Sequence, residues 1–278
     1  MKKLIPLLLA LSLLAGCGGP KETAQSPEPT PELSAPLPSG PQAAPAADWK
    51  TEAPWWTGVD ADKLPARCGE TEYVDGETHY VPFQESDKLG LILYAVTRDG
   101  RDGVQFLLRK DDTLGEAFRR EGSFSNGLCA FSSGDYDGDG DEEYIISLSR
   151  AGGSSDLILC EWDKAGGWTF HPYDRDAYNP QLSELLSFRS TGGTVTLICG
   201  AAAVSYSLRE HEAEAAPMED FSGVAMLTPS GDAITAAFGV GAVIDGTPKI
   251  FAVLRAEPSY DGKTFTLQAP HLEEMIGV

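Results

Sequence analysis

Acidic residues alternate near the middle of the chain, at Asp135, Asp137 and Asp139. Gly140 then permits a sharp turn, after which Glu143 can return a carboxylate to the same centre. A hard cation such as Ca²⁺ takes about six to eight oxygen ligands, and alternating acids wrap oxygens around one point. Without a cation these carboxylates would repel one another at close range. We therefore predict a calcium loop at residues 135–143, called the acidic loop below.

The donors of this predicted site include one main-chain group. The predicted ligands are the side chains of Asp135, Asp137, Asp139 and Glu143, the backbone carbonyl of Asp141, and water at any vacancy. Mg²⁺ is disfavoured, because it retains its waters and seldom uses an all-protein loop. An EF-hand is also disfavoured, since its bidentate Glu would fall at Ile146 and the following residues indicate a strand. The alternative is an acidic surface turn that binds nothing specifically.

The segment from Ala130 to Leu148 resembles the FG-GAP or VCBS-type repeat, the calcium-loop unit of integrin-like β-propellers. In that family a Gly-Asp-aromatic-Asp-Gly-Asp-Gly turn leads into an apolar strand, as Gly134–Gly140 does here. The resemblance implies the same ligand positions, with Glu143 in place of the commoner Asp. A second copy of the repeat is not found in the sequence, so the resemblance supports the loop more than a whole propeller. The predicted role of the ion is structural.

The residues around the acidic loop predict an all-β body with antiparallel hairpins, a small β-propeller-like or β-sandwich fold. The predicted strands are Leu89–Thr97, Val104–Arg109, Tyr144–Ser149, Leu157–Trp162, Trp168–Pro172, Thr194–Cys199, Val204–Leu208, Val224–Leu227, Ile250–Arg255 and Phe265–Gln268. Hairpin turns are predicted at Arg98-Asp99-Gly100, Ala165-Gly166-Gly167, Thr191-Gly192-Gly193 and Tyr260-Asp261-Gly262-Lys263.

A few short connecting helices are predicted between these strands, at Asp112–Arg120, Pro180–Phe188 and Pro270–Ile276. The charged, alanine-rich stretch Glu210–Glu219 indicates an exposed loop or a loose helical turn. The mostly apolar stretch Ala233–Ile244 indicates a buried strand and turn rather than a membrane segment.

The N-terminus has the layout of an export signal. Two lysines precede the apolar run Leu4–Leu14, and small residues then lead to Cys17. The run is shorter than the roughly 20 residues of a permanent span. Leu14-Ala15-Gly16-Cys17 resembles the bacterial lipobox, in which the thiol receives a diacylglyceryl group before cleavage. The resemblance implies that the signal peptide 1–16 is removed and that Cys17 anchors a lipoprotein in the membrane. An ordinary secretory signal with a chance cysteine is the alternative.

A proline-rich stretch, residues 17–48, separates this anchor from the body. It holds almost nothing bulky, so it cannot bury enough apolar surface to offset ordering, and we predict a disordered, flexible tether. Residues 49–278 are then expected to form one extracytoplasmic domain. Trp49, Trp55 and Trp56 stand where tether meets body, and we expect them to pin the first segment onto the core rather than to stack on sugars.

The composition limits the partners. Lys and Arg total 21 against 42 Asp and Glu, a formal net charge of −21 at pH 7. An acidic body repels phosphate backbones, so nucleic-acid binding is not expected. Four further cysteines, Cys68, Cys129, Cys160 and Cys199, form disulfides or serve as small buried hydrophobes, and both interpretations stay open.

Catalytic motifs are missing at useful spacing: there is no nucleophile elbow, no His-Glu-x-x-His and no phosphate loop. We expect a non-enzymatic module, held by lipid on the extracytoplasmic face of the cell membrane, or in an outer membrane where the host has one. It would bind a protein or glycan, or act as a scaffold of the cell envelope. The alternative is a surface-anchored hydrolase with a dispersed acidic site, which a deep cleft with paired carboxylates would favour.

Overall fold

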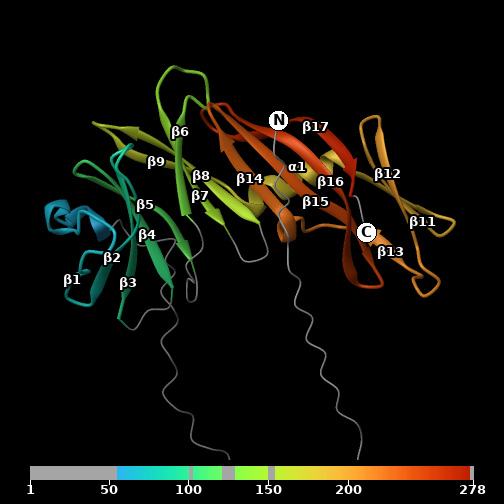
Figure 1. The fold of residues 1–278 in the computed structure, drawn as a ribbon, viewed down its shortest axis with the longest axis horizontal. Coiled ribbons are helices and arrows are strands. Elements are labelled where there is room, and N and C mark those ends of the chain that lie inside the picture. The colour runs from blue at the N-terminus through green and yellow to red at the C-terminus, as the bar shows by residue number, and fades with distance from the viewer. Residues whose placement is uncertain (1–54, 100–102, 121–128, 150–153, 276–278) are drawn as a thin grey trace, which may run out of the picture. The chain divides into compact units, whose positions relative to one another are not determined.

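The computed structural model describes residues 55–99, 103–120, 129–149 and 154–275 (Figure 1). The predicted signal peptide, Cys17, the tether and Trp49 lie outside these ranges. In the part described, antiparallel strands predominate and a single α-helix is present, which confirms the all-β prediction. The strands form four sheets, three of them simple meanders of consecutive strands. This arrangement is propeller-like, because propeller blades are also successive antiparallel meanders.

The first sheet contains five strands, each paired with the next along the chain. Its strands are β1 (Tyr73–Asp75), β2 (Thr78–Ser86), β3 (Leu91–Arg98), β4 (Val104–Lys110) and β5 (Thr113–Arg120). Two 3₁₀ helices, η2 (Trp55–Gly58) and η3 (Ala61–Lys63), precede it. Trp56 packs against a core cluster that includes Leu64, Tyr80 and Tyr94, so the predicted role of Trp56 in pinning this segment is confirmed.

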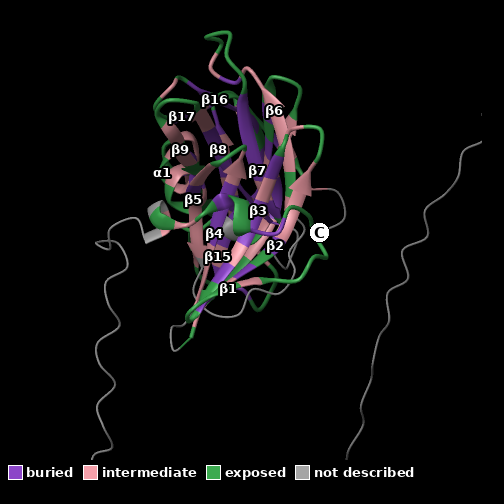
Figure 2. Cartoon of the chain, turned by 90° about the vertical axis from the view of Figure 1, so that its left-hand side faces the viewer, coloured by how far each residue is buried: buried purple, intermediate pink, exposed green. Residues whose placement is uncertain are grey.

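The second sheet carries the acidic loop and is buried on both faces. Its strands are β6 (Cys129–Gly134), β7 (Glu143–Ser149), β8 (Ser155–Asp163) and β9 (Gly167–Tyr173). In β7, Tyr144 and Ile146 belong to a core shared with the first sheet, whereas Ile145 belongs to the core that the other two sheets share. Burial on both faces explains why β7 and β8 have continuous apolar runs rather than alternating patterns (purple in Figure 2).

The third and fourth sheets follow α1 (Arg175–Leu185). The third holds β10 (Ser187–Thr191), β11 (Thr194–Cys199) and β12 (Ala202–Ser207). The fourth holds β13 (Ala215–Pro217), β14 (Ala225–Ser230), β15 (Ala233–Ile244), β16 (Thr247–Tyr260) and β17 (Phe265–Glu274), with the short 3₁₀ helix η4 (Ser222–Val224) before β14. The segment Ala233–Ile244, predicted as buried strand and turn, is thus one twelve-residue strand.

The predicted helix Asp112–Arg120 is wrong, because all of these residues except Asp112 form β5. A two-residue turn at Asp111 and Asp112 brings Thr113 opposite Lys110, and Asp111 has φ 51°, a left-handed conformation that Asp tolerates. Gly115 then packs against the rings of Trp168 and Phe170, where a Cβ would lie only 2.8 Å from the Trp168 side chain. Pairing with β4 and this contact outweigh the local helical pattern.

The predicted helix Pro270–Ile276 is also wrong in its described part, because β17 continues to Glu274. β17 is the last strand of its sheet and its pairing with β16 shifts register between Arg255 and Glu257. Proline is tolerated on an edge strand or beside such a bulge. The preceding residue, Ala269, has φ 48°, in keeping with this local irregularity.

The third predicted helix exists with different bounds. Asp174 caps α1, since its Oδ1 accepts a hydrogen bond from the Asp176 backbone at 3.0 Å, so the helix begins at Arg175. Pro180 therefore lies inside the helix rather than in its first turn, and the helix ends at Leu185. The stretch Glu210–Glu219 is mostly exposed, as predicted, but it also includes the short strand β13 and the buried Glu212.

The four cysteines beyond Cys17 are free. Cys160 and Cys199 are buried, Cys129 is partly buried and Cys68 is exposed. The disulfide interpretation is therefore wrong, and the interpretation as small buried hydrophobes fits Cys160 and Cys199 but not the exposed Cys68. In the portion of the chain that is described, no helix combines the length and the apolar character needed to cross a membrane.

Candidate metal centre

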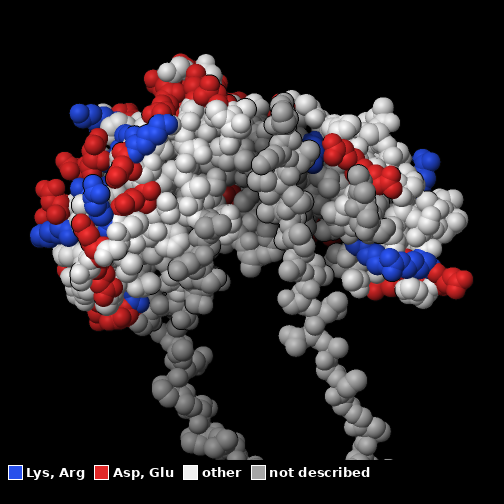
Figure 3. Space-filling view, viewed as in Figure 1, with Lys and Arg blue, Asp and Glu red and all other residues white. Residues whose placement is uncertain are grey.

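The acidic loop joins β6 to β7 within one hairpin. Its base is closed by the pairing of Gly134 with Glu143. Gly138 and Gly140 have φ of 79° and 96°, which glycine adopts without strain, so the predicted sharp turn is present. Red acidic atoms gather over this hairpin in the space-filling view, at the upper edge where Figure 1 shows the loop beyond β6 (Figure 3).

Short hydrogen bonds fold the loop back onto its own amides. Oδ1 of Asp135 accepts from the Gly138 backbone at 2.8 Å, and Oδ1 of Asp137 accepts from the Asp139 backbone at 3.1 Å. The backbone N–H of Tyr136 donates to Oε2 of Glu143 at 2.7 Å. Each bond occupies one oxygen of its carboxylate and so restricts the orientation of that side chain.

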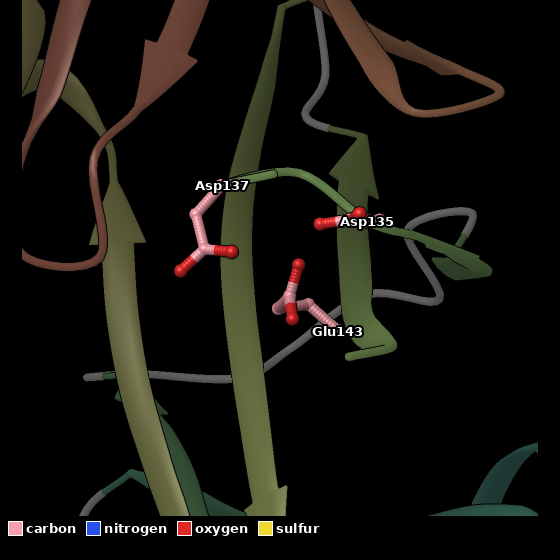
Figure 4. Close-up of side chains that lie close together, drawn as sticks. All are labelled: Asp135, Asp137 and Glu143. Atoms are coloured by element: carbon pink, nitrogen blue, oxygen red, sulfur yellow. The ribbon is translucent and has the colours of Figure 1, made fainter. Parts of the chain in front are cut away.

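Three of the predicted ligands come together. Asp135, Asp137 and Glu143 each offer one carboxylate oxygen, and these oxygens all lie within 4.8 Å of one another (Figure 4). Figure 4 shows the three carboxylates converging on a common space, with Glu143 reaching in from the start of β7. Glu143 is buried, whereas both aspartates are half-buried.

The other two predicted positions lie outside this group. Asp139 is exposed, and its Oδ1 accepts a hydrogen bond from the Asp141 backbone at 2.8 Å. Asp141 is exposed too, and it was predicted to contribute only its carbonyl oxygen. The sequence pattern therefore identifies the loop, and the structure brings together three of its five predicted ligand residues.

Burial and mutual repulsion disfavour the charged forms of the carboxylates in this site when no cation is bound. Burial raises the pKa of Glu143, and the negative charges of Asp137, Asp139 and Asp135 raise it further, although the hydrogen bond from Tyr136 lowers it. The pKa of Asp137 is also raised, first by burial and then by its acidic neighbours. A cation between these groups would offset both effects.

Residues far away in the sequence surround the loop. Oδ1 of Asp232, in the turn between β14 and β15, accepts a hydrogen bond from the Asp135 backbone at 3.2 Å. A Cβ built on Gly262, in the turn between β16 and β17, would lie 3.4 Å from Oδ2 of Asp137. The charge of Glu161 on β8 is close enough to raise the pKa of Asp137. Sequence reasoning missed all three neighbours, because nothing local marks a contact across such separations.

The donors suit a hard cation. They are all carboxylate oxygens, the ligand type of Ca²⁺, Mg²⁺ and Mn²⁺, and no thiol or imidazole belongs to the group. Three carboxylates supply three to six oxygens, and main-chain oxygens or water would complete a calcium shell of about six to eight.

The acidic loop lies outside the two described surface grooves. One groove, of about 280 Å³, includes Glu85, Asp87 and Asp111. The other, of about 460 Å³, crosses the fourth sheet and includes Met226 and Arg255. The converging carboxylates therefore belong to neither groove.

Comparison of the chain with protein-family models, with curated proteins and with solved structures gives no match. The resemblance to the FG-GAP or VCBS-type repeat therefore stays a prediction that rests on residues 130–148.

Proposed function

We propose that this protein is a calcium-stabilised binding or scaffold module of the cell envelope, tethered by lipid at Cys17 on the extracytoplasmic side. The convergence of Asp135, Asp137 and Glu143 carries the calcium part of the proposal. The lipobox resemblance supports the anchor, and the proline-rich tether would hold the body away from the membrane. The partner would be a protein or a glycan.

Calcium would act on stability. An ion that binds only the folded protein stabilises it by about 2.7 kcal/mol when its concentration is a hundred times the dissociation constant. In the acidic loop this gain would include relief of the repulsion among buried and half-buried carboxylates. The loop joins two strands of the central, doubly buried sheet, so ordering it stabilises the hairpin on which both cores depend.

A thermal melt in calcium and in chelator tests the metal site. The wild-type chain should melt about 5–10 °C higher in calcium than in chelator. Asp137→Asn should abolish this difference while melting in chelator no lower than wild type, since it removes one repelling charge. Asp60→Asn is the matched control: Asp60 makes the same kind of turn, accepting from the Asp62 backbone at 3.2 Å in the segment before the first sheet. An equal wild-type melting point in calcium and chelator would contradict the proposal.

Labelling with a radioactive fatty acid in a bacterial host tests the anchor. Wild type should incorporate the label and sediment with membranes, and Cys17→Ala should do neither. Cys68→Ala is the control, because that exposed thiol lies in the folded body. Equal incorporation by wild type and Cys17→Ala would show that Cys17 is not the acceptor.

A further inference from the structure

The turn between β14 and β15 lies directly against the first residue of the acidic loop. Ser230 pairs with Ala233, so Gly231 and Asp232 form the two-residue turn, with Gly231 at φ 60°. Oδ1 of Asp232 accepts the hydrogen bond from the Asp135 backbone, although the two residues stand 97 positions apart. The fourth sheet therefore contacts the acidic loop at its first predicted ligand, Asp135.

The close approach depends on Gly134. A Cβ at this position would lie 2.8 Å from the carbonyl oxygen of Gly231 and 2.9 Å from Oδ1 of Asp232. Such distances are too short for any side chain, so only glycine lets the turn reach the end of β6. The contact therefore needs both the missing side chain of Gly134 and the acceptor oxygen of Asp232.

Two acids hold consecutive amides at this point. The Asp135 amide donates to Asp232 and the Tyr136 amide donates to Glu143. Glu143 belongs to the converging group, but Asp232 does not. Because the Asp135 side chain extends from the backbone that Asp232 holds, the direction of its carboxylate depends on a residue of another sheet.

We infer that Asp232 is a positioning residue for the candidate metal centre, orienting Asp135 toward Asp137 and Glu143 without binding the ion. This inference rests on the proposed calcium site and adds a determinant of its affinity. Groups that orient metal ligands change metal affinity strongly, typically by tenfold or more when they are lost.

Calorimetric titration of the wild-type chain and three variants with calcium alone tests the inference. Asp232→Ala removes the acceptor and should weaken calcium affinity about tenfold. Asp232→Asn removes the charge but keeps an oxygen that accepts from Asp135, so it should stay within about threefold of wild type. The melting point of each variant in chelator measures any loss of stability that is unrelated to the ion.

The matched control is Asp245→Ala. Asp245 lies in the turn at the opposite end of β15 and accepts from the Glu214 backbone at 3.0 Å. This variant should lose stability in chelator and keep wild-type calcium affinity. Wild-type affinity in Asp232→Ala would overturn the inference and leave the calcium site standing. Equal weakening in Asp232→Ala and Asp232→Asn would also overturn it, because charge alone would then explain the effect. A wild-type chain that binds no calcium would overturn both proposals.

Discussion

The hydroxyl of Tyr260 donates a hydrogen bond to Oε1 of Glu161 at 2.8 Å, joining β16 to β8 across 99 positions of sequence. Nε2 of His171 lies 3.3 Å from the same oxygen, and the centroids of the His171 and Tyr260 rings are 5.0 Å apart. Tyr260 is only 3% exposed. The second and fourth sheets are therefore linked by a partly buried polar contact as well as by their apolar core.

Loss of this hydroxyl should destabilise the fold. Tyr260→Phe removes a hydrogen bond to a charged group, and we expect it to lower the free energy of unfolding by about 1–2 kcal/mol in urea denaturation. Tyr173→Phe is the control, because the buried Tyr173 hydroxyl has no hydrogen-bond partner among the described residues. That variant should be neutral or stabilising. Equal losses in the two variants would refute the assigned role of the Tyr260 bond.

The ion pair of Glu212 and Lys249 should stabilise the fold by neutralising a buried carboxylate. The Glu212 side chain is 3% exposed, and its carboxylate contacts Lys249 and accepts from the Arg209 backbone at 2.9 Å. Lys249→Met would leave a buried carboxylate without its cation, so we expect a loss of about 3 kcal/mol. Glu212→Gln in the Lys249→Met background should recover most of this loss, since Gln is neutral and still accepts. Urea denaturation of the wild type, Lys249→Met, Glu212→Gln and the double variant measures these losses, and additive losses would show that the pair is not coupled.

Gly241 should be the least replaceable glycine of the fourth sheet. A Cβ at this position would overlap the backbone of Lys249 and Ile250, where β15 and β16 shift register. We expect Gly241→Ala to destabilise the fold by more than about 3 kcal/mol, which thermal melting or the yield of soluble protein would reveal. Gly223→Ala is the control, because nothing lies within 4 Å of its Cβ position. A Gly241→Ala chain as stable as Gly223→Ala would contradict the predicted overlap.

Thiol reactivity should follow burial. Burial raises the pKa of Cys129 to about 12 and that of Cys160 well above its usual value. Only the thiolate reacts, so at pH 8 about one Cys129 thiol in ten thousand is reactive, and reactivity rises as pH approaches the pKa. Brief alkylation followed by mass spectrometry should label exposed Cys68 first and Cys160 only after denaturation. A mass two daltons low, from a disulfide, would contradict the free thiols.

Much of the fold follows from local sequence. Apolar runs and glycine turns predict β11 at its observed bounds and locate β4, β7, β8 and β9 within two residues. The sequence does not predict β5, because its turn of two aspartates has no glycine to mark it. It predicts only the first part of β17, Phe265–Gln268, because Pro270 is tolerated in a strand only at a sheet edge or beside a bulge.

The candidate site also has one part that local sequence predicts and another part that depends on the folded structure. Alternating acids and glycines predict the acidic loop, since its ligands lie within nine residues of sequence. Which acids converge depends on the hairpin register, which places Glu143 opposite Gly134 and leaves Asp139 exposed. The contact of Asp232 with Asp135 depends on the packing of two sheets, and a single sequence carries no local signal for it.

A crystal structure of the chain grown in calcium would show directly whether the acidic loop holds an ion. We expect one ion bonded to oxygens of Asp135, Asp137 and Glu143 at about 2.3–2.6 Å, with further main-chain or water oxygens completing its shell. The same carboxylates pointing apart into solvent, with no ion between them at saturating calcium, would contradict it.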